Sequence, residues 1–181
     1  MESQRLVNLA AELKRPIDVL LRVNPGIEAH THEYIRTSGS DSKFGISIKK
    51  AEEIAELIQP VLNSEYVTFK GFHSHIGSQI TETEGFEKAL EIMIDFIREM
   101  KEQYRITAGC LSIGGGFGIK YTAVDKPIPL GEMAEILART CETLIAEKGV
   151  ALKKLLIEPG RSIVGEAGYA LYRVGFSKDT D

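Results

Sequence analysis

Three consecutive glycines, Gly114–Gly116, follow the short apolar run Cys110–Ile113, and a fourth glycine stands at position 118. Ordered glycine costs conformational entropy, so three in a row after a strand indicate positive φ angles or a backbone that lies directly against another group. Peptide N–H groups exposed in such a loop bind oxyanions, above all phosphate. A plain strand-to-loop turn is the alternative. The spacing matches neither the GxGxxG fingerprint nor a P-loop.

A second chemical motif is Glu158-Pro159-Gly160-Arg161, in which proline and glycine separate two opposite charges. Glu158 directly follows the apolar run Lys154–Ile157, which we expect to be a buried strand. A charge at the end of a buried strand must be paired or functional. The motif therefore predicts an anion and a cation facing one pocket, with a surface ion pair as the alternative.

A pair of histidines, His73 and His75, follows another predicted strand, where alternation would point both side chains to the same face. Such a pair can bind a metal, with Glu158 or another carboxylate completing the site. It can also place a flat imidazole against a cofactor ring. A pair of core histidines bonded to backbone is the third interpretation.

Ser78 follows a glycine shortly after the histidines and could offer its hydroxyl and N–H to the same phosphate as the glycine triplet. An ordinary loop serine is equally compatible with this position. A second histidine pair, His30 and His32, lies in the long polar stretch Ile27–Gly45, where we expect exposure to solvent. Loops of that length inside a compact domain are more often functional than not.

These motifs together offer a phosphate cradle at the glycines, an anion at Glu158, a cation at Arg161 and a flat ring at His75. A phosphorylated aromatic cofactor with a basic ring nitrogen requires these parts. In pyridoxal phosphate, a carboxylate on the pyridine nitrogen keeps that nitrogen protonated, so that the ring accepts electrons from a substrate carbanion. Pyridoxal phosphate is therefore the predicted cofactor.

Hydrophobic periodicity predicts the elements that position these residues. The predicted strands are Ile17–Val23, Tyr66–Phe72, Cys110–Ile113 and Lys154–Ile157, and the predicted helices are Glu2–Lys14, Ile48–Leu62, Phe86–Tyr104 and Glu132–Glu147. The continuous apolar character of Ile17–Val23 is typical of a strand covered on both faces. The segment Ser162–Phe176 alternates loosely, which indicates one or two further strands.

Strands alternating with helices predict an α/β fold with a parallel sheet and helical crossovers. Each motif follows a strand, and active sites of such folds lie at the carboxyl ends of the strands. A complete (β/α)8 TIM-type barrel takes about 250 residues. With four clear strands in 181 residues, we expect one partial barrel domain over residues 1–181, about half of a barrel. An open doubly wound sheet is the alternative.

Composition narrows the function classes. The formal net charge is −4, which argues against a nucleic-acid or anionic membrane surface, and no apolar run is long enough to span a membrane. Two cysteines, Cys110 and Cys141, are expected to be free thiols of a reducing compartment, so cytoplasm is the predicted location. Unpaired edges on Ile17–Val23 and on the last strand predict an oligomer or poor solubility.

Five motifs, in this order and spacing, resemble the diaminopimelate decarboxylase family: LLRVNPG (Leu20–Gly26), SKFGI (Ser42–Ile46), GFHSHIGSQI (Gly71–Ile80), SIGGGFG (Ser112–Gly118) and EPGRSIV (Glu158–Val164). That family belongs to the alanine-racemase-like, fold-type III pyridoxal-phosphate proteins. GSQI and the segment Thr31–Ile35 look more like the diaminopimelate enzymes than like ornithine or arginine decarboxylases.

The resemblance implies roles for eight residues at matching positions. His75 would stack on the cofactor ring and Glu158 would bind its pyridine nitrogen. The phosphate would be held by Ser78 and Gly114–Gly116, with Gly160 and Arg161 nearby, and Arg161 would also reach a substrate carboxylate. Two further family positions, Arg22 and Lys43, are left without a role.

The implied reaction is the pyridoxal-phosphate-dependent decarboxylation of meso-2,6-diaminopimelate to L-lysine, by an enzyme that is a homodimer in the family. The family's Schiff-base lysine and its C-terminal β-domain have no counterpart in this sequence, so we expect a central portion without a catalytic lysine and inactive alone. Lys43 is a poor substitute, because such an amine must be desolvated. The alternatives are an ornithine or arginine decarboxylase, a non-catalytic cofactor-binding remnant, and a zinc hydrolase using His73 and His75.

Overall fold

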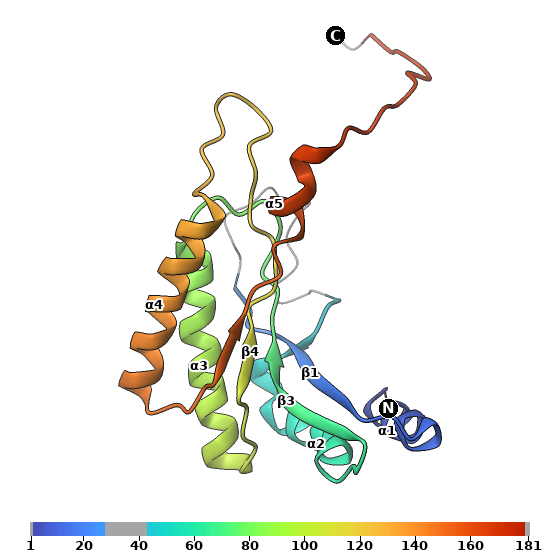
Figure 1. The fold of residues 1–181 in the computed structure, drawn as a ribbon, viewed down its shortest axis with the longest axis vertical. Coiled ribbons are helices and arrows are strands. Elements are labelled where there is room, and N and C mark those ends of the chain that lie inside the picture. Colours follow the sequence, from blue (N-terminus) through green and yellow to red (C-terminus); the bar gives the residue numbers. More distant parts are fainter. Residues whose placement is uncertain (1, 28–42, 180–181) are drawn as a thin grey trace.

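The computed structural model describes residues 2–27 and 43–179, and within them the chain forms a five-stranded parallel sheet in the order β2-β1-β3-β4-β5 (Figure 1). The strands are β1 (Ile17–Asn24), β2 (Ile46–Ser47), β3 (Val67–His73), β4 (Cys110–Ser112) and β5 (Lys154–Leu156). Four of them confirm the predicted strands. The short strand β2 was not predicted, and it pairs with the end of β1, so this edge of the sheet is β2.

Four long helices confirm the helices that the hydrophobic periodicity predicted. They are α1 (Glu2–Leu13), α2 (Ala51–Leu62), α3 (Glu84–Tyr104) and α4 (Leu130–Lys148), with a 3-10 turn, η2 (Ile48–Lys50), before α2. None of the helices in the described part of the chain is long and apolar enough to cross a membrane.

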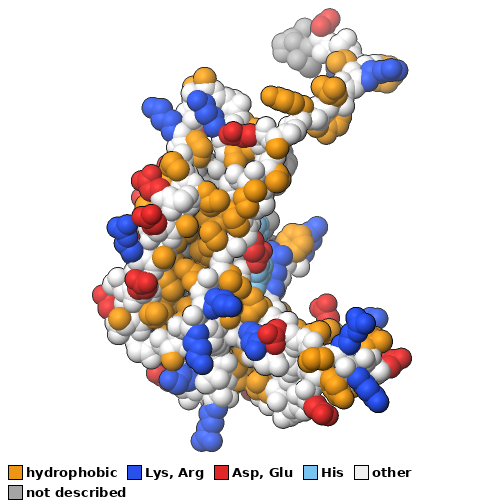
Figure 2. All heavy atoms as spheres, in the orientation of Figure 1, with side chains coloured by type: hydrophobic (Ala, Val, Ile, Leu, Met, Phe, Trp, Pro, Cys, Tyr) orange, Lys and Arg blue, Asp and Glu red, His pale blue; other side chains and the backbone are white. Residues whose placement is uncertain are grey.

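The prediction of strands in Ser162–Phe176 is wrong. This stretch begins with the short helix α5 (Gly160–Val164) and the 3-10 turn η3 (Gly165–Ala167), and the chain then runs on without regular structure. A strand needs a neighbouring backbone to pair with, and this segment extends away from the sheet with its apolar side chains exposed (Figure 2). Alternating hydrophobicity alone therefore did not make a strand.

The helices form one layer on one face of the sheet. Successive helices contact one another from α1 to α4, and β1, β3, β4 and β5 are neighbours in chain order (Figure 1). A doubly wound sheet would place helices on both faces and reverse its strand order at a switch point. The arrangement is instead that of a partial (β/α)8 barrel with its helices outside.

The main hydrophobic core lies between this helix layer and the sheet. Phe72 and Leu111 project from β3 and β4 onto the apolar stripe of α3, and all of these side chains are fully buried. The stripe consists of Phe86, Ala89, Leu90, Met93, Ile94, Phe96, Ile97 and Met100. This packing fixes the ends of β3 and β4, where the motifs begin.

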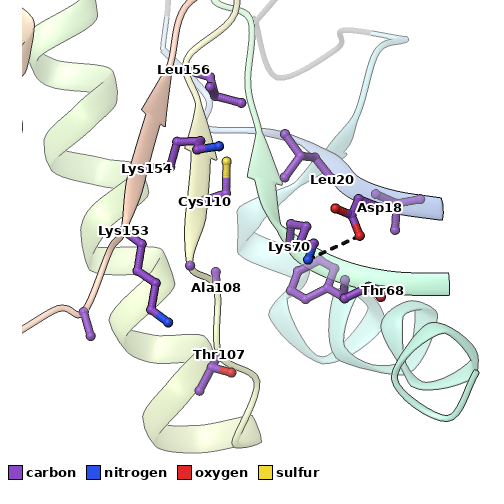
Figure 3. A pocket seen from close by; sticks show the side chains of 14 residues that line it. Asp18, Leu20, Thr68, Lys70, Thr107, Ala108, Cys110, Lys153, Lys154 and Leu156 are labelled. Atoms are coloured by element: carbon purple, nitrogen blue, oxygen red, sulfur yellow. Dashed lines mark ion pairs between the residues drawn. The ribbon is translucent and has the colours of Figure 1, made fainter. Parts of the chain in front are cut away.

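The opposite face of the sheet is open and forms a hollow of about 810 Å³ lined by Leu20, Cys110 and Leu156, among others (Figure 3). An ion pair of 3.2 Å between Lys70 and Asp18 lies on this face. The prediction that Lys154–Ile157 is buried is wrong, because β5 is an edge strand covered by helices on one side alone. Leu156 is 38% exposed as a result.

Candidate cofactor-binding site

Four side chains form a row across the carboxyl ends of the strands. Arg22 of β1 pairs with His73 of β3, His73 pairs with Ser112 of β4, and Ser112 pairs with Leu156 of β5. Since side chains alternate along a strand, Glu158, two residues after Leu156, returns to the side of this row. Parallel register thus brings residues from four distant segments to one place.

Glu158 is the centre of this cluster. Its Oε1 atom accepts a hydrogen bond of 2.6 Å from the Ser112 hydroxyl, and the Nε2 atom of His73 lies 3.2 Å from Oε1 and 3.4 Å from Oε2. The Glu158 side chain is 54% exposed, not buried as its position after an apolar run suggested, because β5 is an edge strand. The expectation that the carboxylate is paired is nevertheless confirmed.

The surroundings of Glu158 favour its charged form. Burial by itself would raise the pKa of this carboxyl, but the hydrogen bond from Ser112 and the charge of His73 outweigh it and hold the pKa below its ordinary value. Glu158 is therefore an anion at neutral pH, as a partner for a protonated ring nitrogen must be.

His75 contacts the loop after β4 that contains Gly114–Gly116, called the glycine loop below. Its Nδ1 atom accepts a hydrogen bond of 3.3 Å from the Gly115 amide. Burial lowers the pKa of His75, and the positive charges of Arg22 and His73 lower it further, whereas Glu158 acts in the opposite direction. The imidazole is accordingly neutral, with its proton on Nε2, and it presents a flat uncharged ring near Glu158.

The glycine triplet lets three loops meet. Gly114 and Gly116 have φ angles of 75° and 96°. A Cβ atom on Gly114, Gly115 or Gly116 would lie 2.5 Å from the Ser74 carbonyl oxygen, 2.3 Å from that of Glu158 and 2.0 Å from that of Gly77, respectively. Both conditions that the sequence predicted for these glycines are confirmed, and the group against the backbone is the chain itself.

Two amides of the triplet already have partners, because Gly114 donates to the Ser112 hydroxyl and Gly115 donates to His75. No hydrogen bond joins the Gly116 amide to another residue in the described part of the chain. Ser78 lies beside Gly116, since its Cα is 3.5 Å from the position of a Cβ there. An oxyanion at this loop would thus meet Gly116 and Ser78 first.

The remaining predicted residues lie at the same end of the sheet. The Gly160 amide donates to the Glu158 carbonyl oxygen at 2.9 Å, and a Cβ on Gly160 would meet nothing within 4 Å. Arg161, in the first turn of α5, donates through Nη1 to Gln79 Oε1 at 3.3 Å, and its guanidinium carbon is 5.9 Å from the centre of the Tyr121 ring. The EPGR motif thus holds its cation at this end of the sheet.

Sequence reasoning missed Gln79 and Ser112. Gln79 has a φ of 59°, and its amide group bonds to both backbone groups of Ile119, donating to the carbonyl oxygen and accepting from the amide. Gln79 therefore joins the loop after β3, which carries His75, to the loop after β4, which carries Gly114–Gly116, and it also accepts a hydrogen bond from Arg161. Both residues stood inside quoted motifs, but a polar side chain at or after the end of a strand gives no sign of its partner.

Arg22 and Lys43 meet at Phe44. The Arg22 guanidinium carbon lies 5.0 Å from the centre of the Phe44 ring, and the Lys43 Nζ lies 5.2 Å from it. Lys43 is exposed, so its amine is not desolvated as a Schiff-base amine must be. His30, His32 and the segment Thr31–Ile35 lie outside the described residues.

The residues present fit pyridoxal phosphate. An anionic carboxylate for the ring nitrogen, a neutral imidazole, an amide at Gly116 and the Arg161 guanidinium lie on adjacent loops. Within residues 2–27 and 43–179, no group of three or more His, Cys, Asp or Glu side chains is arranged to hold a metal ion, so the zinc-hydrolase alternative has no support there.

Comparison with known proteins adds independent observations. Residues 1–165 match the family model of the pyridoxal-dependent decarboxylases, pyridoxal-binding domain. The chain is 42% identical to the diaminopimelate decarboxylase of Bacillus subtilis, over 96% of this chain and 39% of that protein, and 43% identical to that of Staphylococcus aureus, over 90% and 38%. It thus spans about two fifths of the length of these relatives.

Solved structures give the same result. The diaminopimelate decarboxylase of M. jannaschii in co-complex with L-lysine superposes with a TM-score of 0.74 at 31% identity, over 90% of this chain and 36% of that one. The enzyme of Helicobacter pylori, complexed with L-lysine, gives a TM-score of 0.72 at 28% identity, over 90% and 38%. With the family model matching nine tenths of its residues, the chain belongs to the pyridoxal-dependent decarboxylases.

Proposed function

We propose that this chain forms the cofactor-holding part of an enzyme that decarboxylates meso-2,6-diaminopimelate to L-lysine with pyridoxal phosphate. The observation that carries the proposal is the cluster of Glu158, His75 and the glycine loop at one end of the sheet. The relatives named diaminopimelate decarboxylase support this substrate, and the L-lysine bound to two of the superposed structures is the product of the proposed reaction.

Each residue has a defined task in this proposal. Glu158 holds a proton on the pyridine nitrogen, and His75 lies flat against the ring. Ser78, Gly116 and Arg161 bind the phosphate, with Gly114, Gly115 and Gly160 shaping the loops around it. The cofactor, when bound, supplies an electron sink for the carbanion left by loss of carbon dioxide.

His75 suits its task because it is neutral. A charged imidazolium would repel a protonated pyridine ring, whereas the hydrogen bond from Gly115 and the partial burial of His75 favour the uncharged form. Glu158 suits its own task for the opposite reason, since Ser112 and His73 keep it charged. The pKa values of both groups are lowered, which leaves the Glu158 carboxylate charged and the His75 imidazole neutral.

Arg161 is also proposed to reach a carboxylate of the substrate. An ornithine or arginine decarboxylase remains the second candidate, because the family model covers several pyridoxal-dependent decarboxylases. The two differ in the distal end of the substrate, which carries a second carboxylate in diaminopimelate. Carbon dioxide release from meso-diaminopimelate, ornithine and arginine, measured on the enzyme of which this chain is proposed to form a part, separates them.

We also propose a homo-oligomer in the cytoplasm that binds no nucleic acid. The outer edges of β2 and β5 are available for pairing, the net charge is −4, and the thiols of Cys110 and Cys141 are free. Sedimentation velocity tests the oligomer, and a monodisperse monomer would contradict it.

Calorimetric titration of the chain with pyridoxal phosphate tests the cofactor proposal. We expect one site per chain and a loss of about tenfold or more in affinity on Glu158→Gln, because a charge-assisted hydrogen bond is replaced by a neutral one. Glu135→Gln, on the exposed side of α4, is the matched control and should leave the affinity unchanged. Absence of binding to the unmodified chain would overturn the proposal.

A further inference from the structure

Ser112 is a fully buried polar residue at the last position of β4. Its hydroxyl donates to Glu158 Oε1 at 2.6 Å and accepts from the Gly114 amide at 3.2 Å. Serine at the end of a strand has no need of either partner to form the strand. The hydroxyl therefore links the Gly114 backbone to the Glu158 carboxylate.

The direction of both hydrogen bonds is determined by chemistry. A backbone amide can only donate, so the Gly114 N–H occupies an acceptor position of the Ser112 oxygen. The single hydroxyl proton is then directed to Glu158, whose ionised carboxylate can only accept. Oε1 is thereby engaged, and Oε2, which lies 3.4 Å from His73 Nε2, is the oxygen less tightly held.

The backbone reinforces the same link. The Glu158 amide donates to the Gly114 carbonyl oxygen at 2.8 Å, so Gly114 and Glu158 are joined directly, and Ser112 joins their polar groups a second time through its side chain. A glutamate side chain has three rotatable bonds, and a backbone contact does not fix them. The Ser112 hydroxyl, at 2.6 Å, makes the shortest contact to the carboxylate, and His73 Nε2 lies at 3.2 and 3.4 Å from its two oxygens.

We propose that Ser112 is a positioning residue that orients the carboxylate of Glu158, leaving the Oε2 atom of Glu158 to meet a pyridine ring nitrogen. The use of the oxygen for a ring nitrogen rests on the proposed function, whereas the orientation of Glu158 by Ser112 does not. Ser112 does not touch the cofactor in this proposal, and its effect on a ring nitrogen is exerted through Glu158.

The chain offers a matched control in Ser74. Ser74 is also fully buried and follows the end of β3, and its amide donates to the Ser112 carbonyl oxygen at 2.8 Å. Its hydroxyl, however, has no hydrogen-bond partner among the described residues. Ser74→Ala therefore removes a buried hydroxyl just after the neighbouring strand β3, at a residue that makes no hydrogen bond to Glu158 among the described residues.

The first experiment measures the pKa of Glu158 by carbon-13 NMR of the chain without ligand. Ser112→Ala should raise this pKa, because the carboxylate loses its donor, and Ser74→Ala should leave it unchanged. Ser112→Thr keeps a hydroxyl at the same position and should restore a low value. An unchanged pKa in Ser112→Ala would overturn the proposal, whatever the chain binds.

The second experiment compares pyridoxal phosphate with its 1-deaza analogue, in which C–H replaces the ring nitrogen. Ser112→Ala should weaken binding of pyridoxal phosphate about tenfold and leave the affinity for the analogue unchanged, since only the former needs an oriented Glu158. Equal losses for both ligands would mean general loosening and would contradict the proposal. If the unmodified chain binds neither ligand, the proposed function fails, and the NMR experiment still decides the role of Ser112.

Discussion

The Nδ1 atom of His75 accepts a hydrogen bond from the amide of Gly115 at 3.3 Å, although the two residues are 40 positions apart in the chain. This contact joins the loop after β3 to the loop after β4 and selects the neutral tautomer of His75 with its proton on Nε2. It also satisfies a buried backbone donor, because Gly115 is buried. The His75 side chain therefore both satisfies the Gly115 amide and presents a neutral ring.

Replacing His75 by phenylalanine should reveal the stability that the hydrogen bond from Gly115 contributes. Phe keeps a flat ring but has no acceptor, so the Gly115 amide loses its partner, at a cost of about 1–3 kcal/mol in the free energy of unfolding. Urea unfolding followed by circular dichroism measures this loss. A midpoint equal to that of the unmodified chain would show that the hydrogen bond carries no stability.

The close approach of the loops predicts a large effect of a single methyl group. In Gly115→Ala the new Cβ would lie 2.3 Å from the Glu158 carbonyl oxygen, which is backbone and cannot turn away, so we expect a destabilisation of roughly 3 kcal/mol. Gly131→Ala, in α4, is the control, because nothing lies within 4 Å of its Cβ position. It should be neutral or slightly stabilising. Thermal unfolding compares the two, and similar midpoints would refute the packing argument.

Stability should fall as the pH drops. The pKa of His75 is lowered in the folded chain by burial and by Arg22 and His73, against the opposing charge of Glu158, so the unfolded chain binds the proton more readily. The stabilisation is complete above the ordinary value of 6.5 and is lost as the pH falls through the lower folded pKa. His75→Gln should remove this slope in urea midpoints measured between neutral and mildly acidic pH. An identical slope in both proteins would count against it.

Gln79 should contribute to binding of the phosphate group of pyridoxal phosphate and not to binding of its pyridine ring. Gln79→Ala removes the acceptor that holds Arg161 and both bonds to Ile119, so binding of pyridoxal phosphate should weaken about tenfold, with little change for pyridoxal, which has no phosphate. Gln103→Ala, at an exposed position at the end of α3, is the control. Equal losses for the two ligands would exclude a phosphate-specific role for Gln79.

The extended segment after η3 should drive self-association. Its apolar side chains, which include Tyr169, Leu171 and Phe176, are almost entirely exposed (Figure 2). Exposed apolar surface of this kind favours contacts with another protein molecule, because the contact removes it from water. Ending the chain at Ala167 should reduce association in sedimentation velocity while leaving the unfolding midpoint unchanged. Undiminished association of the shortened chain would contradict this role of the segment and would favour contacts through the edges of β2 and β5.

Much of the fold was predictable because the signals for it are local. Helical and alternating periodicity placed four helices and four strands, since the burial of one face is already visible within a single turn or strand. The same reasoning failed for Ser162–Phe176 and for the burial of Lys154–Ile157. In both cases the result depends on which neighbours a segment has in space, and periodicity does not report these.

The sequence by itself determined four of the five strands, that their motifs gather at the carboxyl ends, and that a carboxylate and three glycines stand there. Only the tertiary structure determined which of these side chains form hydrogen bonds with one another. Ser112 and Glu158 are 46 residues apart and His73 and Glu158 are 85 residues apart, and parallel register across β3, β4 and β5 brings them within hydrogen-bonding distance. The physical reason is that a hydrogen bond depends on ångström-scale geometry, which is set by strand pairing and core packing together.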